Sequence, residues 1–136
     1  MKLNVKSKRV AVAFLVLQAV LFIGCGLAGL FNPVGVMTSM GIALDNPVSI
    51  TEIRATYGGF LLGAGCYILY AAFSRLHQAL VAVIFLLAGA GVTRFVGVVF
   101  DGGQAFMQWL LLIIEWVSVA IAIILYRMIP KESHAI

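Results

Sequence analysis

Four long apolar stretches, separated by short segments that contain charges, Pro or Gly, constrain this chain more than any other feature of its sequence. Each stretch is close to the roughly 20 residues that a helix needs to cross the hydrocarbon core of a bilayer. Of the 136 residues, 63% are hydrophobic and only 10% are charged, which is far more apolar than a soluble domain of this size. A water-soluble fold, a disordered chain and a nucleic-acid-binding protein are therefore set aside. We predict a single all-α membrane domain with transmembrane helices at about 10–31, 50–73, 79–100 and 106–126.

The connections between these helices predict how they are arranged. The segments 74–78 and 101–105 are so short that the helices they join must be antiparallel neighbours, which gives an up-down four-helix bundle. The longer segment 31–50 contains Asn32 before Pro33 and, further on, Gly41. A cap, a proline in the first turn and a terminating glycine predict a short helix at about 33–40 that lies at the outer surface as a lid. Its Met37 and Met40 fit either a copper(I) pair or, more simply, hydrophobic anchors of an interfacial helix.

The distribution of basic residues predicts the orientation. Seven of the nine fall on one side of the predicted membrane, and that side is then the cytoplasm; they are Lys2, Lys6, Lys8, Arg9, Arg75, Arg127 and Lys131. We therefore expect an inner-membrane protein with both termini in the cytoplasm. A basic start followed by an apolar run also resembles a signal peptide, but the run is longer than a typical signal core, which favours an uncleaved helix.

Four ionisable residues fall inside the predicted membrane helices: Glu52, Arg54, Arg94 and Glu115. Such groups cost a few kcal/mol near the bilayer centre and mark either ion pairs or functional sites. Counting about 1.5 Å per residue places all four in the outer half of the membrane. Because the last two helices are antiparallel neighbours, Arg94 is at a depth where it can meet Glu115. Arg54 is at a depth suited to Glu52, Asp101 or Glu115.

Further polar residues share helix faces with these charges. Asp101 lies on the face of Arg94, and Gln108 and Ser118 lie on the face of Glu115. Together they predict a polar pocket that opens outward. Its expected ligand-binding residues are Glu52, Arg54, Tyr57, Arg94 and Glu115, with Asp101, Gln18, Gln108 and Ser118 at its rim or floor.

Structural interpretations stand beside this pocket. Ser49 and Glu52 have the spacing of a capping box, which would make Glu52 part of a helix start. Asp101 precedes two glycines, as a turn residue does. Arg94 and Glu115 can form a purely structural ion pair. Cys25 and Cys66 lie in apolar runs and predict neither a disulfide nor a zinc site. The remaining pattern is a set of intramembrane glycines, which predicts close helix packing; it comprises Gly24, Gly26, Gly29, Gly59, Gly63, Gly89, Gly91 and Gly97.

The run Thr51-Glu52-Ile53-Arg54-Ala55-Thr56-Tyr57-Gly58-Gly59, followed by Arg94, Gly97, Asp101-Gly102 and Glu115, resembles a bacterial family of four-helix membrane proteins of unknown function, DUF4345. The resemblance covers nearly the whole chain. That family is more distantly similar to DoxX-like membrane proteins, which include quinone-linked oxidoreductase subunits and proteins that help others mature or traffic. The resemblance implies a bacterial membrane protein and implies no catalytic residue.

Three functions follow as expectations. The first is a small inner-membrane protein that is not an enzyme by itself and either binds an amphipathic ligand, a quinone or a lipid, or serves as an accessory subunit of a larger membrane complex. The second is a DoxX-like quinone-linked redox component. The third is a proton-coupled transporter that acts as a dimer and uses Glu115. No metal and no cofactor other than a bound quinone or lipid is predicted, and no role is assigned to His77 or His134.

Overall fold

The computed structural model describes residues 2–102 and 106–129, and within these ranges it is helical and contains no strand. The predicted all-α class is therefore confirmed. In chain order the elements are α1 (Lys2–Phe31), α2 (Pro33–Ser39), α3 (Pro47–Ile53), the π-helix η1 (Arg54–Phe60), α4 (Leu61–Ser74), α5 (Leu76–Phe100) and α6 (Phe106–Met128).

Four helical spans are long and apolar enough to cross a membrane: Val5–Phe31, Pro47–Ser74, Leu76–Phe100 and Phe106–Met128. The second of them is built from α3, η1 and α4 without interruption. The protein is a four-helix membrane protein, as the hydropathy pattern predicts. Large apolar side chains stay exposed along all four spans, which is the surface that a bilayer would cover.

The second span begins earlier than predicted, because the cap that starts it is Asn46. The Asn46 side chain accepts a hydrogen bond from the backbone N–H of Ser49 at 2.9 Å, and Pro47 occupies the first helical position. Ser49 therefore lies inside the first turn of α3, and the capping-box interpretation of Ser49 and Glu52 is wrong.

The third span also begins earlier than predicted. Arg75 alone separates α4 from α5, so the turn between them is shorter than the sequence pattern suggested.

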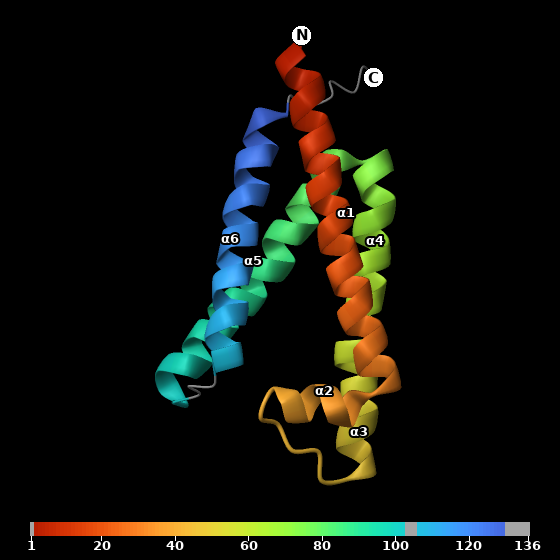
Figure 1. Ribbon diagram of the computed structural model, residues 1–136, viewed down its shortest axis with the longest axis vertical. Coiled ribbons are helices and arrows are strands. Elements are labelled where there is room, and N and C mark those ends of the chain that lie inside the picture. The colour runs from red at the N-terminus through yellow and green to blue at the C-terminus, as the bar shows by residue number, and fades with distance from the viewer. Residues whose placement is uncertain (1, 103–105, 130–136) are drawn as a thin grey trace.

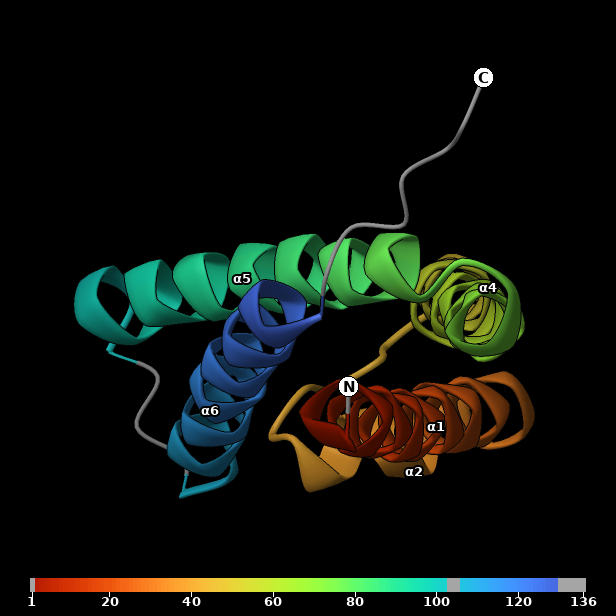
Figure 2. The ribbon, with the colours of Figure 1, turned by 90° about the horizontal axis from the view of Figure 1, so that it is seen from above.

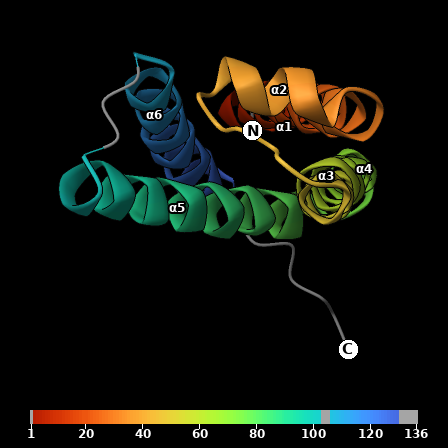
Figure 3. The same cartoon turned by 90° about the horizontal axis from the view of Figure 1, so that it is seen from below.

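The helices form two pairs, α1 with α4 and α5 with α6, and the chain runs up and down through them (Figures 1 and 2). The pairs converge at one end of the molecule, where α1 begins and α6 finishes, and we call this the terminal end. At the opposite end the two pairs splay apart, and α2 lies across that end, so we call it the α2 end (Figures 1 and 3).

The apolar core sits toward the terminal end, where all four spans meet. Because each of them contributes alanines there, the helices approach closely at that level. The buried cluster consists of Ala11, Leu15, Ala19, Ile68, Ala71, Ala72, Ala79, Leu80, Val83, Ala122, Leu125 and Ile129.

Glycines bring α1 into backbone contact with η1 and α4. A Cβ atom added to Gly26 would lie 2.6 Å from the backbone N of Leu62, and one added to Gly58 would lie 2.9 Å from the backbone N of Leu30. The predicted close packing is confirmed at Gly26, whereas a Cβ at Gly24 would meet nothing within 4 Å.

The matching glycines of the second span are Gly58 and Gly65, not the predicted Gly59 and Gly63. Gly58 and Gly65 are seven residues apart, about two helical turns, so both lie on the side of the span that faces α1.

The short helix α2 forms almost where the sequence predicts it. Asn32 caps it by accepting from the backbone N–H of Gly35 at 3.0 Å. At its other end the N–H groups of Gly41 and Ile42 donate to carbonyls of the last turn, and Gly41 has φ +80°, which is a Schellman motif. Met37 is only 2% exposed, which favours the interpretation that it anchors α2.

His77, to which the sequence analysis gave no role, joins the start of α5 to the end of α6. Its Nε2 atom lies 3.0 Å from the carbonyl oxygen of Ile129. Its ring packs edge-on against Tyr126, with the ring centroids 5.3 Å apart. The contact satisfies a carbonyl group just after α6, where helices leave such groups unpaired.

Candidate functional site

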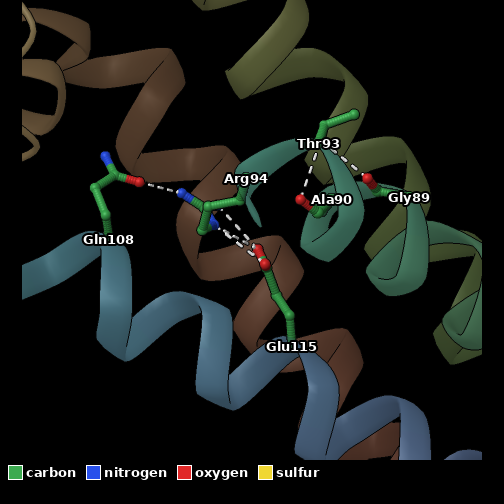
Figure 4. A network of polar contacts seen from close by, with 6 residues as sticks. All are labelled: Gly89, Ala90, Thr93, Arg94, Gln108 and Glu115. Carbon is green, nitrogen blue, oxygen red and sulfur yellow. Dashed lines mark hydrogen bonds and ion pairs between the residues drawn. The ribbon is translucent and has the colours of Figure 1, made fainter. Parts of the chain in front are cut away.

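Arg94 of α5 binds two side chains of α6 (Figure 4). Its Nη2 atom donates to Oε1 of Glu115 at 2.9 Å, and its Nε atom lies 3.1 Å from Oε2 of the same carboxylate. Its Nη1 atom donates to the side-chain oxygen of Gln108. The predicted contact between Arg94 and Glu115 is confirmed, and the guanidinium binds the carboxylate through two of its nitrogens.

Regular helix geometry explains why these three residues meet. Gln108 and Glu115 are seven positions apart on α6 and so lie on one face, two turns from each other. Arg94 is six residues before the end of α5, and its long side chain reaches across the antiparallel pair to lie between them. The Arg94 side chain is 24% exposed and that of Glu115 is 9% exposed. The carboxylate is thus the more deeply buried partner.

Arg94 retains hydrogen-bonding capacity after these contacts. A guanidinium carries five N–H bonds. Glu115 accepts from one N–H on Nε and from one on Nη2, and Gln108 accepts from one on Nη1. One N–H on each of Nη1 and Nη2 therefore has no hydrogen-bond partner among the residues that the structure describes. The charge of Arg94, in contrast, is already balanced by Glu115.

A hollow of about 450 Å³ borders Arg94 at the α2 end. Arg94, Asp101 and Gln108 supply its charged and amide groups, so two residues predicted for the rim lie in its wall. The full lining is Ala90, Thr93, Arg94, Gly97, Val98, Asp101 and Gln108.

Asp101 also has the turn role that was weighed against a site role. It caps the end of α5, where its backbone N–H donates to the carbonyl oxygen of Gly97 at 2.8 Å. Gly102 follows with φ +70°, a conformation that glycine adopts readily. The two interpretations of Asp101 are compatible, because one residue ends the helix and also lines the hollow.

A second polar contact lies deeper in the bundle and joins α1 to α6. The side-chain amide of Gln18 donates to the hydroxyl of Ser118 at 3.0 Å, and both residues are buried. Ser118 lies one turn beyond Glu115 on the same face of α6. Gln18 and Ser118, which were both expected at the rim or floor of the pocket, thus contact each other and do not line the hollow beside Arg94. Beyond them toward the terminal end lies the apolar core.

Tyr57 faces the charged cluster from η1. Its ring is half-buried, packs where Gly29 of α1 lacks a side chain, and is close enough to Arg94 and Glu115 to interact with both electrostatically.

Glu52 and Arg54 do not join this cluster. Both side chains are exposed, and neither forms an ion pair or a side-chain hydrogen bond with any residue that the structure describes. The expected pairing of Arg54 with Glu52, Asp101 or Glu115 is therefore wrong.

Thr93 lines the hollow although the sequence analysis did not single it out. Its hydroxyl donates back to the carbonyl oxygens of Gly89 and Ala90, at 2.9 and 3.0 Å (Figure 4). The hydroxyl oxygen keeps its capacity to accept a hydrogen bond. Its position directly beside Arg94 was the only signal in the sequence that could have indicated it.

The fold and this cluster define a small four-helix membrane protein with a partly buried ion pair beside a hollow at one end. The chain belongs to the family described as a domain of unknown function, DUF4345, whose model matches residues 10–126. It matches no curated protein and no solved structure at a significant level.

Proposed function

We propose that this protein binds an amphipathic molecule, a quinone or a lipid, at the α2 end and catalyses no reaction by itself. The observation that carries the proposal is Arg94, which borders a hollow of about 450 Å³ and has two N–H groups that bind no residue in the described part of the chain. A polar head that accepts hydrogen bonds would bind there. Its apolar tail would lie against the exposed apolar side chains of the spans.

The charge of the site favours a neutral head over an anionic one. Glu115 already compensates Arg94, and Asp101 adds a carboxylate to the wall of the hollow. A phosphate or carboxylate would meet a site with an excess of negative charge, whereas a carbonyl oxygen would need only the free N–H groups. A quinone carbonyl is therefore the head group that we favour.

The positions of the basic residues support an orientation with the α2 end on the outer side of a bacterial inner membrane. Lys6, Lys8 and Arg9 lie at the terminal end of α1, Arg75 lies in the turn at that end, and Arg127 lies in the last turn of α6. Cytoplasmic segments are enriched in such residues. In this orientation both ends of the chain face the cytoplasm, and the ligand enters from the outer leaflet.

The distribution of polar groups supports binding in preference to transport. Arg94 and Glu115 lie toward the α2 end, and apolar side chains fill the bundle beyond Gln18 and Ser118. A transported proton or solute needs polar groups along its whole route. A site that ends on an apolar core instead holds its ligand at one level of the membrane.

Tryptophan fluorescence tests the proposal directly. Trp109 and Trp116 are the two tryptophans of the chain, and each directly follows a residue of the charged cluster on α6. The full chain, reconstituted in nanodiscs, is titrated with a short-chain ubiquinone, whose ring quenches tryptophan on close approach. We expect saturable quenching in the wild type.

The matched variants are Arg94→Gln and Arg54→Gln, because both remove an arginine from the α2 half and only Arg94 borders the hollow. Loss of an arginine donor pair costs about 1.5–3 kcal/mol, so Arg94→Gln should weaken binding at least tenfold, and Arg54→Gln should not. Equal quenching in the wild type and both variants would exclude Arg94 as the binding group.

A further inference from the structure

Glu52 and Arg54 carry opposite charges on the second span, and the ligand site proposed above uses neither of them. Both side chains are exposed, and neither has an ionic or hydrogen-bonding partner among the residues that the structure describes. Residues two positions apart point to opposite sides of a helix, so the two charges lie on either side of the strip of helix surface that contains Ala55.

That strip continues along the span as a surface of small residues. Ala55, Gly59 and Gly63 follow one another at intervals of four residues, which is close to one helical turn, and all three are exposed. The span packs against α1 and α5 on its other sides (Figure 2). We call the surface formed by Ala55, Gly59 and Gly63 the open face.

The glycines of the open face do not pack against the rest of the described chain. A Cβ atom added to Gly63 would meet nothing within 4 Å, and one added to Gly59 would meet only the backbone oxygen of Arg54, at 3.8 Å. The contact with α1 is made instead by Gly58 and Gly65. Since small residues on a membrane helix let another helix approach closely, the open face has room for a helix from outside the molecule.

The depth of Glu52 and Arg54 favours the formation of ion pairs. At about 1.5 Å per residue, the helix from Arg54 to the turn at Arg75 is about 30 Å long, which is close to the thickness of the hydrocarbon layer. The two charges therefore lie near the boundary of that layer at the α2 end. An ion pair is stronger there than at a surface that is fully surrounded by water.

We propose that two copies of this chain associate through their open faces, with Glu52 of each copy paired with Arg54 of the other. The basic residues at the terminal end make both copies insert the same way round, so their second spans run parallel. In a two-fold interface, each contact between two different positions occurs twice. Opposite charges on the two flanks of one face therefore meet in two identical pairs, as flanking charges do in parallel coiled coils.

Energy transfer between labelled copies in liposomes tests this proposal. Full chains that carry a donor or an acceptor dye at the C-terminus are reconstituted at a series of protein-to-lipid ratios, and we expect the wild type to dimerise. Glu52→Arg and Arg54→Glu each turn two attractive contacts into two repulsive ones. Each should therefore raise the dissociation constant at least about tenfold.

The charge reversals also provide the decisive control. A chain with both Glu52→Arg and Arg54→Glu has its opposite charges in exchanged positions and should dimerise about as well as the wild type. Chains with only one of the reversals should associate with chains that carry only the other. A double reversal that associates as weakly as the single ones would overturn the pairing of Glu52 with Arg54.

A glycine pair tests the position of the interface. Gly63→Leu should prevent association, because the new side chain fills the space of the second helix. Gly89→Leu is the matched control, since Gly89 is exposed on α5 and a Cβ there also meets nothing within 4 Å. Equal effects of the two substitutions would overturn the open face as the interface.

The dimer and the ligand site can fail separately, because Arg94 and its hollow belong to α5 and α6. Arg54→Glu should weaken association and leave the quenching by quinone unchanged. A wild type that stays monomeric at every protein-to-lipid ratio would assign the open face to lipid or to another membrane protein, and it would overturn the dimer.

Discussion

The ion pair between Arg94 and Glu115 makes a quantitative prediction about stability. Glu115→Gln leaves the guanidinium without its counter-ion, and Arg94→Gln does the same to a carboxylate whose side chain is only 9% exposed. Breaking a fully buried pair by removing one partner costs about 3–5 kcal/mol. Because the Arg94 side chain is 24% exposed and water can reach it, we expect each single substitution to cost about 2 kcal/mol.

The double substitution should cost less than the sum of the single ones. With both charges removed, two glutamine amides face each other, and no ion remains in a medium of low dielectric constant. We expect the variant that carries both Arg94→Gln and Glu115→Gln to lose about 1 kcal/mol relative to the wild type, compared with about 4 kcal/mol if the two effects were additive.

These free energies of unfolding are measured on the full chain in bicelles, where steric trapping monitors reversible unfolding. The assay is combined with the quinone titration, because the double variant is predicted to regain stability without regaining binding. A double variant that loses the full sum of the single effects would refute the reasoning, since it would show that the two side chains contribute to stability separately.

Two further predictions concern packing. A Cβ at Gly26 would lie 2.6 Å from the backbone N of Leu62, so Gly26→Ala should push α1 away and cost about 1–3 kcal/mol, whereas Gly24→Ala, with nothing within 4 Å, should leave the unfolding free energy unchanged. Equal effects at the two glycines would contradict the backbone contact. His77→Ala removes the contacts with Ile129 and Tyr126 and should lower the free energy of unfolding by about 1 kcal/mol. It should also speed amide hydrogen exchange in the last turn of α6. Unchanged exchange there would show that this contact does not stabilise the helix end.

The features that the sequence predicted well are those set by hydropathy, loop length and local capping. Four apolar stretches and two short turns were enough to specify the spans and their up-down order. Asn32, Pro33 and Gly41 were enough to specify α2, because each of these residues acts within a few positions of itself. The contact between Arg94 and Glu115 was also predictable, since both lie in regular α-helices whose connection is short.

The features that the sequence did not predict depend on rotation about a helix axis. Counting residues gives the depth of Glu52 and Arg54 in the membrane, but it does not give the direction of their side chains. The depth alone therefore placed Arg54 at the level of the pocket, and the structure leaves its side chain exposed at the start of the π-helix η1.

The two helix pairs are held together in different ways, and the difference bears on what the ion pair does. In a bilayer, apolar burial gives no driving force between helices, so small residues and polar contacts must supply it. Glycines let α1 touch η1 and α4 through their backbones, whereas α5 and α6 are joined by Trp116 over Gly91 and by the ion pair.

Arg94 does more than join α5 to α6. Two of its N–H groups form no hydrogen bond with any residue that the structure describes, and Arg94 also lines the hollow. Because the Arg94 side chain is 24% exposed, water can accept hydrogen bonds from these groups. In the function that we propose, the polar head of the ligand replaces that water and accepts the same hydrogen bonds.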